Sequence, residues 1–322
     1  MVKTGTAERE AALVEVARPG VMISNAWPDS RETEGATFQA IESVFGDSDF
    51  FEALQVVDVP FASERRSIAA LVKERGIPLT YTLTRVFAEN GLNLSDLETA
   101  NRERSWRAVV DRFDEAEATG AATVGVVSGA RPAEGGRRAE ALKALEDSLF
   151  HIAGAAADRP LNVLIEPLDY EAHKRCTLGK TEEAVDICRS IASRGPALGL
   201  CLDTAHMILN GDDVIESVEM ARDFILEFHF CNCVTDRRHP LFGDRHLPFG
   251  PPGVVNTGVV AQKMAAMRHM GFLNPRDRPR VLCEVILNEG MTSMDVVRHC
   301  RKTLQAAWET ARGLCRDAPA DG

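Results

Sequence analysis

The chain has 322 residues, of which 45% are hydrophobic, and a formal net charge of −11 at pH 7. A chain of this length can bury a large core, as two small domains or as one α/β barrel. The overall negative charge argues against a nucleic-acid-binding protein, since binding a phosphate backbone requires a concentrated basic face. A small basic patch is still compatible with this net charge.

The sequence has none of the signals of a membrane or disulfide-rich protein. No run of 18 apolar residues predicts a membrane span, and the first twenty residues lack the apolar core of a signal peptide, so we expect a cytoplasmic protein. Eight cysteines are scattered along the chain, several of them in apolar, strand-like runs. This distribution favours reduced core thiols over disulfides, with a zinc site at Cys231 and Cys233 as a minor alternative.

Apolar runs alternate with amphipathic segments along the chain, a pattern typical of a parallel sheet covered by helices. The predicted strands are residues 21–26, 53–59, 78–86, 123–127, 162–167, 198–204, 226–231 and 280–286. The predicted helices are residues 63–75, 102–118, 138–157, 181–194, 215–224, 257–270 and 293–312. Eight strand units predict an α/β protein with a single (β/α)8 TIM barrel over residues 1–322, with peripheral or frayed ends at 1–20 and 313–322.

Ligand-type side chains stand at the ends of the last four predicted strands, one from each: Glu166, Asp203, His229 and Glu284. The carboxyl ends of barrel strands converge, so we expect these side chains to meet. Burying carboxylates in runs such as VLIEP and VLCEV is costly unless a cation or strong donors compensate them. The set predicts one divalent ion, Mn²⁺ first and Mg²⁺, Co²⁺ or Zn²⁺ as alternatives.

Other polar residues lie beside this set. No histidine precedes His151, whereas His206 and His246 stand next to the proposed ligands. The long loop at 234–255, rich in proline and glycine, is expected to form part of the site. For His173 and Lys174, after the fifth strand, a solvated loop is the favoured interpretation.

The segments E-P, L-D-T-A-H, H-x-C-N, G-D-R-H-x-x-x-G-x-x-G and C-E resemble the xylose isomerase-like barrel superfamily, which includes sugar phosphate isomerases and epimerases, over residues 21–310. The resemblance implies a metal site at the four residues above and substrate contacts from a further set of polar side chains: His206, Asp244, Arg245 and His246.

The implied function is a metal-dependent sugar isomerase or epimerase that removes a proton next to a metal-polarised carbonyl and forms an enediolate. Glu166 and Glu284 are the candidate base and acid on the two faces of the substrate, and His206 is the candidate proton shuttle. The expected partners are a carbohydrate substrate and further copies of the chain, with neither nucleic acid nor membrane.

Three alternatives stay open. The segments EPLDYEAHKRCTLGKTEEA and CNCVTDRRHPLFGDRHLPFGPPG resemble catalytic subunits of C-glycoside deglycosidases, which implies a lyase acting on a 3-keto C-glycoside with a small second subunit. An endonuclease IV-like nuclease is disfavoured because the early strands hold no histidine and the chain is acidic. A non-catalytic carbohydrate-binding barrel would not need an intact ligand set.

Overall fold

The computed structural model describes residues 11–133 and 135–317. Within these residues eight parallel strands close into a barrel in the order β1, β10, β7, β6, β5, β4, β3, β2, which confirms the predicted (β/α)8 fold. The barrel strands are β1 (Arg18–Met22), β2 (Ala53–Val56), β3 (Leu79–Thr82), β4 (Thr123–Val127), β5 (Asn162–Glu166), β6 (Gly199–Asp203), β7 (Ile225–Cys231) and β10 (Arg280–Glu284). A separate two-stranded ribbon is formed by β8 (Cys233–Val234) and β9 (Gly243–Asp244).

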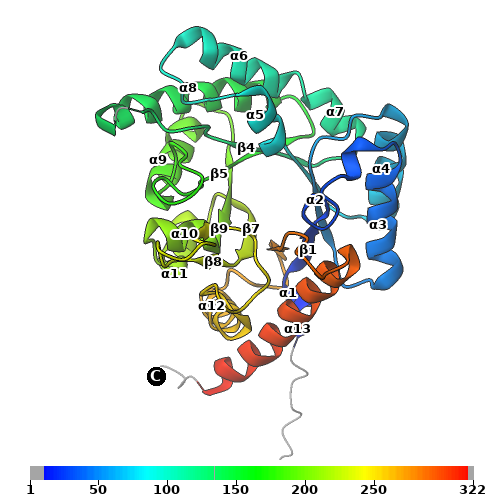
Figure 1. Cartoon of the computed structure of the whole chain (residues 1–322). Coiled ribbons are helices and arrows are strands. Elements are labelled where there is room, and N and C mark those ends of the chain that lie inside the picture. Colours follow the sequence, from blue (N-terminus) through cyan, green and yellow to red (C-terminus); the bar gives the residue numbers. More distant parts are fainter. Residues whose placement is uncertain (1–10, 134, 318–322) are drawn as a thin grey trace, which may run out of the picture.

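The helices form an outer ring around the strands, with α13 lying alongside α12 (Figure 1). The α-helices are α1 (Leu13–Val16), α2 (Ile23–Ala26), α3 (Ala36–Asp47), α4 (Ala62–Arg75), α5 (Thr84–Asn90), α6 (Thr99–Val110), α7 (Phe113–Ala118), α8 (Arg138–Ala156), α9 (Thr181–Ala192), α10 (Thr204–Asn210), α11 (Val214–Ala221), α12 (Thr257–His269) and α13 (Ser293–Asp317). Two short 3-10 turns are η1 (Ser30–Glu32) and η2 (Gly135–Arg137).

Strand alternation separates an apolar outer layer from a polar barrel interior. On β7, Phe228 and Phe230 pack edge to face with ring centroids 5.0 Å apart in the core between sheet and helices. Successive side chains of a strand point to opposite faces, so Glu227 and His229 share the interior face. Both are fully buried, at 1% and 0% exposure.

The structure corrects several sequence boundaries. The first strand begins at Arg18 instead of residue 21, and residues 23–26 form α2. Leu13, Val16 and Ala17 are buried in the core, so the described part of the predicted peripheral N-terminus packs against the barrel. Helix α13 continues to Asp317. The predicted helix at 102–118 is broken between α6 and α7, and helix α3 was missed. The remaining predicted peripheral residues, 1–10 and 318–322, lie outside the described part of the chain.

Four of the helices are followed by a glycine with positive φ: Gly76, Gly120, Gly195 and Gly271. The seven cysteines whose side chains the structure describes are buried and free, as the sequence pattern predicts. No helix in the same residues is both long and apolar enough to cross a membrane.

Gly20 explains why a strand forms over a Pro-Gly pair that the sequence pattern disfavours. It pairs with Ala53 of β2 on one side and Leu282 of β10 on the other. A Cβ at this position would lie 2.7 Å from Leu282 Cγ and 2.8 Å from the Ala53 carbonyl oxygen. Glycine therefore permits the close approach of three neighbouring strands.

We predict that Gly20→Ala lowers the free energy of unfolding by about 1–3 kcal/mol through overpacking at this contact. Gly154→Ala is the matched control, because Gly154 lies in α8 with no heavy atom within 4 Å of an added Cβ. It should be stabilising by up to about 1 kcal/mol. Urea denaturation measures both, and equal effects of the two substitutions would contradict the packing argument.

Candidate active site

The four predicted ligand residues meet at the carboxyl-terminal mouth of the barrel. They come from β5, β6, β7 and β10, which are consecutive neighbours in the barrel. His229 Nδ1 lies 3.0 Å from Glu284 Oε1 and 4.0 Å from Glu166 Oε1. Ligand atoms of Asp203 and Glu284 lie within 4.8 Å of each other. The side chains predicted to share one site are thus close together, and each is buried.

A further buried carboxylate, outside the predicted ligand set, orients the His229 ring. Glu227, two residues earlier on β7, lies 2.8 Å from His229 through Oε1 and Nε2. Its other oxygen, Oε2, accepts a 2.6 Å hydrogen bond from Thr80 Oγ1 and lies 3.5 Å from Arg280 Nη1. With Nε2 directed at Glu227, Nδ1 is the nitrogen that faces Glu166 and Glu284. Glu227 was not predicted from the sequence, although its position two residues before His229 was the available signal.

The pKa values of the three carboxylates in this set differ in how far neighbouring histidines offset their burial. Burial raises the pKa of Glu166 to about 7, and the neighbouring Glu284 adds to this. Burial also raises the pKa of Asp203 to about 6, against the effect of His206. Burial acts in the same direction on Glu284, but His229 and His246 hold the pKa of Glu284 well below its usual range. Glu166 and Asp203 are therefore the undercompensated carboxylates.

Two potential metal-ligand atoms beside these carboxylates make no hydrogen bond to the described residues. Asp203 caps α10 with Oδ1, which accepts hydrogen bonds from the Ala205 and His206 amides. Its Oδ2 and His229 Nδ1 are buried and make no hydrogen bond to the described residues. A carboxylate oxygen without a hydrogen-bond donor, together with an imidazole nitrogen 3.0 Å from Glu284 Oε1, fits a divalent cation.

A second polar cluster adjoins these residues and contains the predicted His206, Asp244 and His246. His246 Nε2 lies 2.8 Å from Glu284 Oε2, and its Nδ1 lies 3.5 Å from Asp244 Oδ2. His206 lies 3.5 Å from Asp169 and 3.8 Å from Asp244. Burial would lower the pKa of His206, but Asp169, Asp244 and Asp203 raise it to about 9.

Lys174 also belongs to this cluster, so the expectation of a solvated loop was wrong for it. Its Nζ lies 3.0 Å from Asp244 Oδ2, and the chain after β5 folds over the barrel mouth. Asp169 holds this turn by accepting hydrogen bonds from the backbone amides of His173 and Lys174. The local sequence is hydrophilic and therefore predicts an exposed loop, but the loop folds back over the barrel and buries most of Lys174. Arg245, in contrast, is exposed and does not line the cavity.

A cavity of about 630 Å³ opens above these residues. Its charged wall contains Glu166, Lys174, His206, His246 and Glu284. Several other residues of its lining are apolar: Met22, Phe87, Leu92, Val127 and Leu168. The volume lies within the range of about 300–1,000 Å³ that suits small-molecule ligands.

Two residues at the cavity edge have an uncommon backbone conformation. His246 has φ 49° and Arg175 has φ 54°, although neither is glycine. Such conformations cost about 1–3 kcal/mol and concentrate at functional sites. Here they direct His246 toward Glu284 and reverse the chain directly after Lys174.

Two buried thiols approach the site. Cys201 is grouped with Glu166 and His229, and Cys231 lies 3.3 Å from Asp244 Oδ1. Burial raises the pKa of both thiols well above the usual value, so they are neutral. Cys233 belongs to no such group among the described residues, which leaves no Cys231–Cys233 zinc pair there.

Comparison with known proteins identifies the family. The family model described as xylose isomerase-like TIM barrel matches residues 32–290. The chain belongs to this family. No curated protein sequence matches significantly.

Several solved structures are similar to this chain in fold at low sequence identity. An L-ribulose 3-epimerase has a TM-score of 0.70 and 15% identity, covering 95% of this chain and 100% of its own. The 3-keto-D-glucoside 4-epimerase YcjR from E. coli has a TM-score of 0.63 and 13% identity, covering 89% and 99%. The IolI protein, solved with a zinc atom, has a TM-score of 0.67 and 15% identity, covering 90% and 97%.

We predict that Glu227→Ala lowers the free energy of unfolding by about 3–5 kcal/mol, because it leaves Arg280 and His229 buried without their shared carboxylate. Glu103→Ala removes a carboxylate that is 49% exposed and paired with Arg107 on α6, and should change stability by no more than about 0.5 kcal/mol. Urea denaturation compares the two. A loss below about 1 kcal/mol for Glu227→Ala would contradict its role in charge compensation.

Proposed function

We propose that this protein is a divalent-metal-dependent sugar isomerase or epimerase of the cytoplasm, with Glu166, Asp203, His229 and Glu284 as metal ligands. The observation that carries the proposal is the convergence of buried ligand atoms from four neighbouring strands beside a cavity. Structural similarity to sugar epimerases and to a zinc-containing protein supports it. Mn²⁺ is our first choice of ion for this oxygen-rich set.

The bound ion would polarise a substrate carbonyl and lower the energy of the negative charge that develops when a neighbouring proton leaves. Glu166 and Glu284 stand on the outer two of the four ligand strands, on opposite sides of Asp203 and His229. They are the proposed base and acid on the two faces of the substrate. His206, placed 3.5 Å from Asp169 and 3.8 Å from Asp244, would bind a hydroxyl group or move a proton.

The polar cluster around Asp244 would bind the other sugar oxygens. Lys174 and His246 both line the cavity and both contact Asp244, which fixes their positions. An ammonium and an imidazole in fixed positions can donate hydrogen bonds to hydroxyl or keto oxygens. Arg245 is left out of this role because it is exposed.

A second candidate is a lyase acting on a 3-keto C-glycoside, together with a small second subunit. The apolar part of the cavity lining favours it, since Met22, Phe87 and Leu92 offer no hydrogen bonds to a sugar but would bury an aromatic group attached to one. Both candidates begin with the same proton abstraction next to a carbonyl. They differ in whether the carbon–carbon bond to the aglycone then breaks.

Activity assays test the proposal and separate the candidates. The purified protein is dialysed against a chelator and incubated with a ketohexose or a 3-keto C-glycoside, with and without Mn²⁺. We expect Mn²⁺ to restore turnover, with an epimer as product in the first case and free aglycone in the second. Glu166→Gln and Glu284→Gln should each lower kcat by about 10²–10⁴-fold, since each removes a proton-transfer group.

His151→Ala is the control for these variants, because His151 is exposed on α8 and stacks on Trp106 away from the cavity. Its kcat should equal that of the unmodified protein. Turnover that survives complete metal removal, or full kcat in both glutamine variants, would contradict the proposed mechanism.

A further inference from the structure

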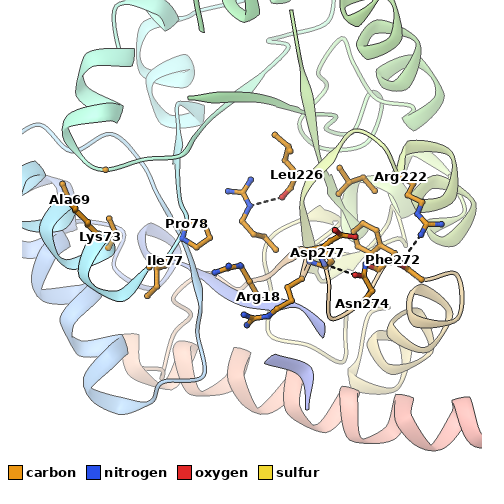
Figure 2. Close-up of a pocket in the computed structure, with 18 residues that line it drawn as sticks. Arg18, Ala69, Lys73, Ile77, Pro78, Arg222, Leu226, Phe272, Asn274 and Asp277 are labelled. Atoms are coloured by element: carbon orange, nitrogen blue, oxygen red, sulfur yellow. Dashed lines mark hydrogen bonds between the residues drawn. The ribbon is translucent and has the colours of Figure 1, made fainter. Parts of the chain in front are cut away.

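A basic cavity of about 850 Å³ occupies the opposite, amino-terminal mouth of the barrel. Five cationic side chains from separate parts of the chain line it: Arg18, Lys73, Arg222, Arg278 and Arg280. Asp277 is the one carboxylate in its described lining. Figure 2 shows Arg18 between Lys73 on one side of the view and Asp277 and Arg222 on the other. On a chain with a net charge of −11, this is a local reversal of sign.

Two of the five cations are neutralised within the protein. Arg280 has a side chain only 11% exposed and lies 3.5 Å from the buried Glu227. Arg278 forms an ion pair with Glu52. These contacts leave little surplus charge from Arg278 and Arg280.

The other three cations have no carboxylate partner among the described residues. Arg222 donates only to the carbonyl oxygen of Gly271, at 3.2 Å, while Arg18 and Lys73 make no ion pair there. Arg18 is also the register partner of Arg280 across β1 and β10, so two arginines begin adjacent strands. Five cations against the carboxylates of Glu52, Glu227 and Asp277 leave an excess of two positive charges.

Gathering these charges has an electrostatic cost that an anion would remove. Like charges held in one cavity repel each other, and this repulsion is stronger near a protein surface than in bulk water. Guanidinium groups present several N–H donors in a planar fork that matches the oxygens of phosphate. A dianionic phosphate would balance the excess of two charges.

We propose that this cavity binds a phosphate-bearing small molecule, such as a phosphate monoester, through Arg18, Arg222 and Lys73. The site lies at the end of the barrel opposite the candidate active site, and it does not depend on the proposed metal or reaction. The apolar residues Ile77, Pro78 and Phe272 also line the cavity and would contact the organic part of the ligand.

Isothermal titration with inorganic phosphate at low salt tests the proposal, with sodium chloride of equal ionic strength as the reference. We expect saturable binding of one phosphate per chain. Arg18→Gln and Arg222→Gln should each raise the Kd for phosphate at least tenfold, and thermal unfolding in chloride confirms that each variant is folded. Arg189→Gln is the charge-matched control, since Arg189 is 59% exposed on α9, and its Kd should stay unchanged.

Three results would overturn the proposal: no saturable phosphate binding, an equal loss of affinity in Arg189→Gln and Arg18→Gln, or unaltered affinity in both cavity variants. Co-sedimentation with vesicles containing phosphatidic acid separates soluble from lipid phosphate. Binding of free phosphate without vesicle binding supports the soluble ester. Vesicle binding without free phosphate binding contradicts it.

Discussion

The burial of five carboxylates at one mouth of the barrel is the constraint on which the site depends. These residues are Glu166, Asp169, Asp203, Asp244 and Glu284, and none is more than 9% exposed. Buried carboxylates are stable only with compensating charge or hydrogen bonds. Imidazole and ammonium groups compensate Asp169, Asp244 and Glu284, whose pKa values are lowered. Glu166 and Asp203 are compensated less: burial keeps their pKa values raised although His206 and His229 act to lower them, and a cation beside them would complete the compensation.

The barrel interior links this site to the amino-terminal mouth by a buried column of polar side chains. Arg280 begins β10 and lies beside Glu227, which in turn orients His229. Thr80 donates to Glu227 and accepts from Arg280, so the column also ties β3 to the opposite side of the barrel. The same carboxylate therefore neutralises a guanidinium of the basic cavity and positions a candidate metal ligand. Such polar interior layers are compatible with a closed barrel because each member has a partner.

The sequence was sufficient for the fold and for the convergence of the four candidate ligands, because both follow from local patterns. Strand ends in a parallel barrel meet at one mouth, so Glu166, Asp203, His229 and Glu284 could be grouped from position alone. Lys174 and Asp169 could not be assigned to the site from the sequence, since a hydrophilic loop gives no local sign that it folds back over the barrel. Arg18 and Arg222 are far apart in sequence, and only barrel closure brings them to one cavity. The start of β1 at Arg18 was missed because the close contacts that favour glycine at position 20 are with other strands.

The most direct test of the central claim is pulsed electron paramagnetic resonance of the protein loaded with Mn²⁺. The account predicts one Mn²⁺ per chain with coupling to a single histidine nitrogen, and loss of that nitrogen signal in His229→Ala. It also predicts that Asp203→Asn weakens Mn²⁺ binding without abolishing folding. Spectra without nitrogen coupling, or with an exchange-coupled pair of ions, would contradict a single site built from these four strands.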